Sequence, residues 1–183
     1  MNPTDFDPAR LDVTAFAKAG GRLEGAWPLA QLGRLRGLVA AASTDASIAD
    51  VAWSAIGEKR PVRRGESQVW LHVRVTTTLP LECQRCLAAV AVPVSAERSF
   101  RFVHGEDAAA QLDASSEDDV LALTRALDLR ELIEDELLLA LPIVPRHDVC
   151  PMPLPAGTEA THADPEPSPF AALAALKRAR PLN

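Results

Sequence analysis

The sequence predicts an α+β domain with a mainly antiparallel sheet, a long central hairpin, two packed helices and a C-terminal helix on a flexible linker. Apolar and polar residues alternate over two long runs, 69–81 and 90–102, broken in the second by Arg98. This alternation is typical of half-buried strands, because side chains two apart on a strand point to the same face. The predicted elements follow the order strand, helix, strand, strand, strand, which favours a mainly antiparallel sheet.

The N-terminal part of the chain predicts an arm, a short strand and a helix. Residues 1–19 carry few core signals, so we expect an extended arm before a single domain that spans residues 20–145. A short strand over 22–26 follows the Gly20-Gly21 turn. Leucine and valine residues then recur every three or four positions after Pro28, which predicts a helix over 28–42. Its two glycines, Gly33 and Gly37, each weaken that helix by about 1 kcal/mol.

The middle of the chain supplies the remaining sheet. Residues 48–56 are a predicted strand, and 57–65, GEKRPVRRG, form a predicted basic loop before the hairpin. Residues 104–119 are acidic and rich in alanine and serine, and we interpret them as a mobile loop. A short strand over 120–124 follows.

The helix over 129–141 has clear start and stop signals. Asp128 is a good N-cap and Pro142 ends the helix. Leu129, Ile133 and Leu137 share its apolar face, whereas the acidic residues Glu131, Glu134, Asp135 and Glu136 are expected to be mainly solvated. An acidic face that meets a basic ribosomal protein or assembly factor is the alternative.

The C-terminal part predicts a tethered helix. Residues 146–168 are a Pro-rich linker, and Ser168-Pro169 begins an amphipathic helix over 169–180. This helix either folds back on the sheet or docks in a partner's groove, with its basic end touching phosphate. The residues involved are Phe170, Leu173, Lys177, Arg178 and Arg180.

The CQRC motif at the hairpin tip has three interpretations. A thiol enzyme of thioredoxin type is disfavoured, because its cysteines begin a helix and these precede a strand. Two thiolates at a hairpin tip are instead half of a tetrahedral zinc site, and a His and a Cys three apart could complete it. The third interpretation is that the thiols only pack a tight turn. The candidate ligands are Cys83, Cys86, His147 and Cys150.

Composition and charge exclude several classes of protein. No run approaches the roughly 20 apolar residues of a membrane span, and the N-terminus lacks the apolar core of a secretory signal. Three cysteines make a poor disulfide framework, so we expect a cytoplasmic protein. Residues 105–168 hold 15 acidic and 3 basic residues, which argues against strong non-specific nucleic-acid binding but allows local RNA contact. We find no hydrolase triad spacing, phosphate loop or HExxH motif.

Three stretches together resemble the YceD family of bacterial large ribosomal RNA subunit accumulation proteins. They are LECQRC at 81–86, LDLRELIEDELLLALPIVPRHDVC at 127–150 and SPFAALAALKR at 168–178. Their order and spacing also match, and the resemblance covers most of the chain from about residue 20. Some relatives have a second CxxC-like cluster where this chain has only Cys150, preceded by His147. The resemblance implies a cytoplasmic role in the synthesis, processing or stability of 23S rRNA, and no catalytic activity.

We therefore expect a non-enzymatic binding factor that meets 23S rRNA or a large-subunit assembly intermediate, directly or through a protein partner. No membrane and no small-molecule substrate are expected, and zinc is the only cofactor that the sequence suggests. The alternative is a protein–protein adaptor that uses the acidic segment and C-terminal helix without touching RNA. Besides the C-terminal helix, the candidate contact residues are Arg85, which the resemblance marks as characteristic of the family, and the basic-loop residues Lys59, Arg60, Arg63 and Arg64.

Overall fold

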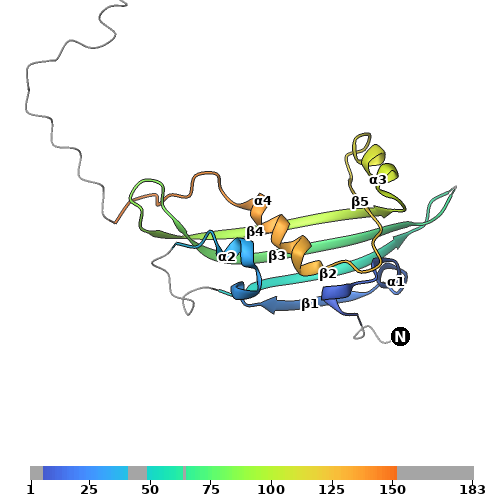
Figure 1. The fold of residues 1–183 in the computed structure, drawn as a ribbon, viewed down its shortest axis with the longest axis horizontal. Coiled ribbons are helices and arrows are strands. Elements are labelled where there is room, and N and C mark those ends of the chain that lie inside the picture. The colour runs from blue at the N-terminus through green and yellow to red at the C-terminus, as the bar shows by residue number, and fades with distance from the viewer. Residues whose placement is uncertain (1–5, 41–48, 64, 152–183) are drawn as a thin grey trace, which may run out of the picture. The chain divides into compact units, whose positions relative to one another are not determined.

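The computed structural model describes residues 6–40, 49–63 and 65–151 of the chain (Figure 1). Met1–Cys150 forms one compact unit. The predicted C-terminal helix over 169–180 lies outside the described residues, as do residues 152–168 of the predicted linker. Arg64 of the basic loop is also outside them.

In the part of the chain that the structure describes, five strands form one sheet in the order β1-β2-β3-β4-β5. The first three pairings are antiparallel, whereas β5 runs parallel to β4. The predicted α+β class and the long central hairpin, formed by β3 and β4, are therefore confirmed. The strands are β1 (Arg22–Trp27), β2 (Val51–Arg60), β3 (Gln68–Glu82), β4 (Ala89–Val103) and β5 (Asp119–Ala122).

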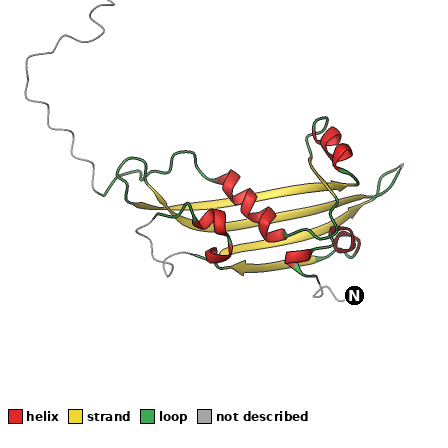
Figure 2. Ribbon diagram, in the orientation of Figure 1, coloured by secondary structure: helices red, strands yellow, loops and turns green. Residues whose placement is uncertain are grey.

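The hydrophobic core lies between one face of this sheet and the helices that cover it (Figure 2). On β3, Leu71, Val73 and Val75 are buried on the covered face, while Arg74 and Thr76 on the opposite face are exposed. Helix α4 (Leu129–Ala140) packs Leu129, Ile133 and Leu137 into this core. It begins as predicted, because the Asp128 side chain accepts hydrogen bonds from the backbone N–H groups of residues 130 and 131.

The N-terminal segment is not the extended arm that the sequence predicts. It contains a 3₁₀ turn, η1 (Pro8–Arg10), and helix α1 (Val13–Lys18), whose N-cap is Asp12. Val13, Phe16 and Ala17 are buried against the sheet. The prediction was wrong because an apolar pattern of a single helical turn or two is too short to stand out, although it is enough to cover one end of the core.

The predicted helix over 28–42 is also wrong in extent. Two short pieces replace it, η2 (Leu29–Gln31) and α2 (Gly33–Arg36), separated at Leu32 by non-helical backbone angles of φ −110° and ψ 86°. Beyond them, Ala40 N–H donates to the carbonyl of Pro80 at 2.8 Å, so the segment joins the sheet instead of continuing a helix. The break lets both Leu32 and Leu35 reach full burial.

Two predicted loops contain regular structure. Strand β2 runs on to Arg60, so Lys59 and Arg60 belong to the sheet and not to the basic loop. The predicted acidic loop over 104–119 contains helix α3 (Glu106–Asp113), which contacts β5 and buries Ala109. Both predictions are wrong because charged residues occur on an exposed strand edge or helix face as well as in loops.

Candidate metal centre

The CQRC motif forms the turn between β3 and β4, as predicted. The backbone N–H of Cys83 donates to the carbonyl of Ala88 at 2.9 Å, and that of Leu87 donates to the carbonyl of Cys83 at 2.9 Å. Leu87 has φ +60°, the left-handed conformation that allows the chain to reverse this tightly. The turn directs both sulfur atoms toward the same side, where the chain after α4 passes.

Hydrogen bonds from two backbone N–H groups hold the segment after α4 against this turn. Gln84 N–H donates to the carbonyl of Pro145 at 2.9 Å, and His147 N–H donates to the sulfur of Cys83 at 3.4 Å. The Nδ1 atom of His147 lies 3.5 Å from the sulfur of Cys86. The hairpin tip and the segment ending at Cys150 thus form one site, although about 60 residues separate them in sequence.

The four candidate ligands meet at this point. The sulfur atoms of Cys83, Cys86 and Cys150 and a ring nitrogen of His147 all lie within 4.8 Å of one another. Sulfur atoms bound to one tetrahedral zinc at about 2.3 Å lie about 3.8 Å apart, so a contraction of about 1 Å at most brings the set to that geometry. Three thiolates and one imidazole are a known structural zinc ligand set, and the donors therefore fit this ion.

The environment of Cys83 favours its ionised form. Burial opposes ionisation, but the backbone N–H groups of Arg85, His147 and Cys86 point at the sulfur, and together they lower the pKa of Cys83 to about 5. Burial and the neighbouring sulfur atoms of Cys86 and Cys83 instead raise the pKa of the Cys150 thiol. In the absence of a metal these shifts favour the thiolate at Cys83 and the thiol at Cys150, and binding of a cation by Cys150 would release its proton.

The candidate contact residues do not gather at this site. Arg85 is exposed at the hairpin tip, next to the cluster, whereas Lys59, Arg60 and Arg63 lie at the opposite end of the hairpin. Lys59 pairs with Val69, and 13 residues of extended strand from there to Glu82 span roughly 45 Å. The basic side chains therefore form two separate groups and not one surface.

Arg60 is engaged within the protein. Its guanidinium lies 4.3 Å from the centre of the Trp70 ring, and one nitrogen lies 2.9 Å from a carboxylate oxygen of Glu58. Hydrogen bonds from Arg60, and then from His72, lower the pKa of Glu58. Arg60 thus has structural contacts that the sequence pattern does not reveal.

The sequence predicts that the acidic face of α4 is mainly solvated, and the structure shows that this is wrong for two of its four acids. Glu134 and Glu136 are both 7% exposed. Arg98 interrupts the apolar pattern of β4, and its Nε atom lies 3.1 Å from the Oε2 atom of Glu136. The pKa of Arg34 is raised mainly by its hydrogen bond to Asp135 and further by its hydrogen bond to Glu134, so this arginine stays charged. Two of the four acids are thereby unavailable to a partner, and their partners lie too far away in sequence for any local signal to predict them.

Among the residues that the structure describes, no helix is long and apolar enough to cross a membrane.

The fold and the site together define an α+β domain with a Cys₃His cluster of the zinc-knuckle type at a hairpin tip. The family model described as "Large ribosomal RNA subunit accumulation protein YceD" matches residues 71–177, more than half of the chain. The chain is 30% identical over 175 residues to a large ribosomal RNA subunit accumulation protein YceD from Haemophilus influenzae, covering 92% of this chain and 95% of that protein. The chain therefore belongs to the YceD family. No solved structure matches it.

Proposed function

We propose that this protein is a non-enzymatic cytoplasmic factor that supports the accumulation of 23S rRNA in the large ribosomal subunit. The observation that carries the proposal is the family relationship, which extends over 92% of the chain and bears that description in a relative of nearly the same length. The described residues add a metal-type cluster and separate basic groups, which suit a binding protein.

The metal cluster has a structural role in this proposal. Cys83, Cys86, His147 and Cys150 would hold one zinc ion with four protein ligands, and such closed sites stabilise a fold and leave no position for a reacting water. Zinc would fix the hairpin tip to the segment after α4. Arg85 would then present its guanidinium from a rigid turn, and a rigid guanidinium is suited to a phosphate or a carboxylate.

Cells depleted of this protein test the role in rRNA accumulation. We expect the ratio of 23S to 16S rRNA to fall, and a plasmid copy of the wild-type chain to restore it. A copy with Cys83→Ser and Cys86→Ser should restore it less well, whereas one with the exposed, non-ligand change Asp148→Asn should restore it fully. An unchanged ratio on depletion would falsify the proposal.

A protein–protein adaptor is a second candidate, favoured by the exposed acids of the segment around α3. Glu106, Asp107, Glu117 and Asp119 are exposed there and could meet a basic ribosomal protein. Crosslinking in cells separates the two candidates. Adducts to 23S rRNA support direct RNA contact, and adducts confined to proteins support the adaptor.

A further inference from the structure

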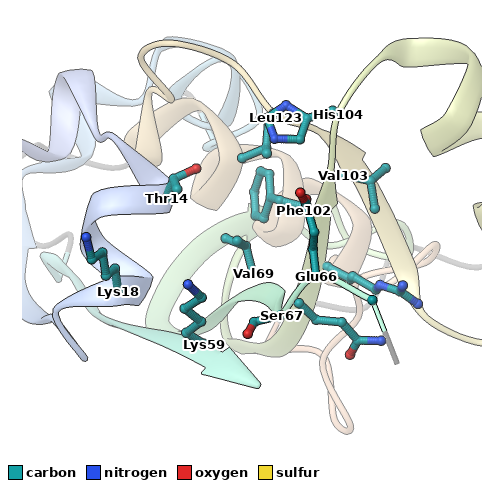
Figure 3. Close-up of a pocket in the computed structure, with 13 residues that line it drawn as sticks. Thr14, Lys18, Lys59, Glu66, Ser67, Val69, Phe102, Val103, His104 and Leu123 are labelled. Atoms are coloured by element: carbon teal, nitrogen blue, oxygen red, sulfur yellow. The ribbon is translucent and has the colours of Figure 1, made fainter. Parts of the chain in front are cut away.

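A cleft of about 670 Å³ opens at the end of the sheet remote from the metal centre (Figure 3). Helix α1 forms one side through Thr14 and Lys18, and the end of β2 contributes Lys59. The buried side chains of Val69 and Phe102 form an apolar floor. The volume falls in the range of pockets that hold small ligands or parts of larger ones. We call this site the end cleft.

Two lysines give the end cleft its charge. Lys18, on α1, and Lys59, on β2, are both exposed and both line the cleft (Figure 3). Within the described part of the chain, neither forms an ion pair. Two like charges that share one cleft repel each other, and an anion placed between them relieves that repulsion. The pair therefore selects for a negatively charged ligand.

The remaining wall adds further donors. Ser67 and Thr14 offer hydroxyl groups to the cleft, and His104 lies across from the two lysines (Figure 3). Arg101 also lines the cleft, and its buried Nε has no hydrogen-bond partner among the described residues, although another guanidinium nitrogen lies 3.8 Å from a carboxylate oxygen of Asp118. Among the described residues that line the cleft, Glu66 is the one carboxylate, whereas Lys18 and Lys59 supply two positive charges.

We propose that the end cleft binds phosphate groups of an RNA strand, an inference that rests on the proposed function and names its RNA-contact site. Lysine ammonium groups and hydroxyl donors are the usual partners of phosphate oxygens, and they position RNA without reading its sequence. The exposed Arg63 follows Lys59 after a short connection at the same end of the sheet and continues the positive charge beyond the cleft. A chain of phosphates fits such an arrangement better than an isolated anion does.

A matched pair of charge variants tests the proposal in the full-length protein. The cleft variant carries Lys18→Gln and Lys59→Gln. The control carries Arg10→Gln and Arg125→Gln, which remove two exposed charges outside the cleft and change the net charge equally. The probe is a fluorescein-labelled 20-nucleotide single-stranded RNA. We expect about 10-fold weaker binding for the cleft variant and less than 2-fold for the control. The dependence of log K on log salt should fall by about 0.7 for each phosphate contact that the cleft variant loses.

A conservative variant separates charge from folding. Lys18→Arg with Lys59→Arg keeps both charges and should restore RNA binding, and circular dichroism should show that all variants are folded. Equal loss of affinity in the cleft and control variants overturns the proposal, as does a wild-type protein that does not bind the RNA. Binding of inorganic phosphate or AMP that the RNA cannot displace also overturns it, since the cleft would then serve a small anion.

The proposed cellular role is tested separately from this contact. If the cleft variant restores the 23S to 16S ratio in depleted cells as well as the wild type, the end cleft is not the RNA-contact site, while the role in rRNA accumulation stands. If depletion leaves the ratio unchanged but the cleft variant still loses RNA affinity in vitro, the contact stands and the proposed role fails.

Discussion

Glu134 on α4 caps the N-terminus of helix α2, a role that its sequence context does not indicate. One carboxylate oxygen accepts the backbone N–H groups of Arg34 and Leu35, at 2.8 and 3.0 Å, and the other accepts Arg34 Nε at 3.2 Å. Helix α2 has no side-chain cap from its own N-cap residue, Leu32. A glutamate 100 residues further along the chain therefore performs that task.

Substitution of Glu134 should destabilise the domain markedly. Glu134→Ala leaves two backbone donors of α2 without an acceptor, and such unsatisfied buried groups cost about 1–3 kcal/mol each. We expect a loss of about 2–4 kcal/mol in the free energy of unfolding, measured by urea denaturation. The control is Asp135→Ala, which removes the exposed partner of the same arginine and should cost less than about 1 kcal/mol. Equal losses would show that the cap is unimportant.

At the scale of elements, α1 and β2 approach so closely that only glycine fits between them. A Cβ at Gly57 would lie 2.7 Å from a ring carbon of Phe16 and 2.8 Å from the backbone nitrogen of Ala17. The backbone of α1 cannot yield as a flexible side chain would. The glycine that suggests a loop in the sequence is thus the residue that lets a helix pack on the strand.

Gly57→Ala should therefore be destabilising. We expect it to lower the free energy of unfolding by about 1–3 kcal/mol, as overpacking typically does. Gly33→Ala is the matched control, because nothing lies within 4 Å of its added Cβ and alanine favours helix α2 by up to about 1 kcal/mol. Thermal unfolding of both variants measures the difference. If Gly57→Ala is as stable as the wild type, α1 does not pack on β2 in this way.

The sequence predicts elements whose signals are local and long. The β3–β4 hairpin and helix α4 were predictable because alternation over a dozen residues and a capped, Pro-terminated amphipathic pattern are both unambiguous. The metal cluster was predictable because its residue types have specific chemistry. Helix α1 was missed because it is short, and the pairing of Glu134 with Arg34 was missed because it depends on contacts across the fold. The end cleft combines side chains from several segments, none of which carries a motif.

At the scale of the whole molecule, the metal cluster joins two parts of the chain that otherwise touch through few backbone hydrogen bonds. A bound zinc should therefore contribute to global stability and not only to local order. Protein purified without chelator should contain about one equivalent of zinc, measured by mass spectrometry. Removal of the metal should lower the melting temperature, and addition of zinc should restore it.

A ligand variant and a neighbouring control make this test specific. Cys83→Ser should lower the zinc content several-fold, whereas Asp148→Asn, which changes an exposed side chain next to His147, should leave it unchanged. A zinc content below about 0.1 equivalent in the wild type would contradict the assignment of these four residues to a zinc site.

The distance in sequence between the two halves of this cluster also determines the delay between their synthesis on the ribosome. Translation at about 5–20 residues per second releases His147 roughly 3–12 s after Cys86, since 61 residues separate them. The hairpin, whose strands are joined by a short turn, can pair during that interval, but the four donors cannot meet. A metal bound by all four donors would thus report that the chain has been synthesised to Cys150 and that the hairpin tip has met the segment after α4.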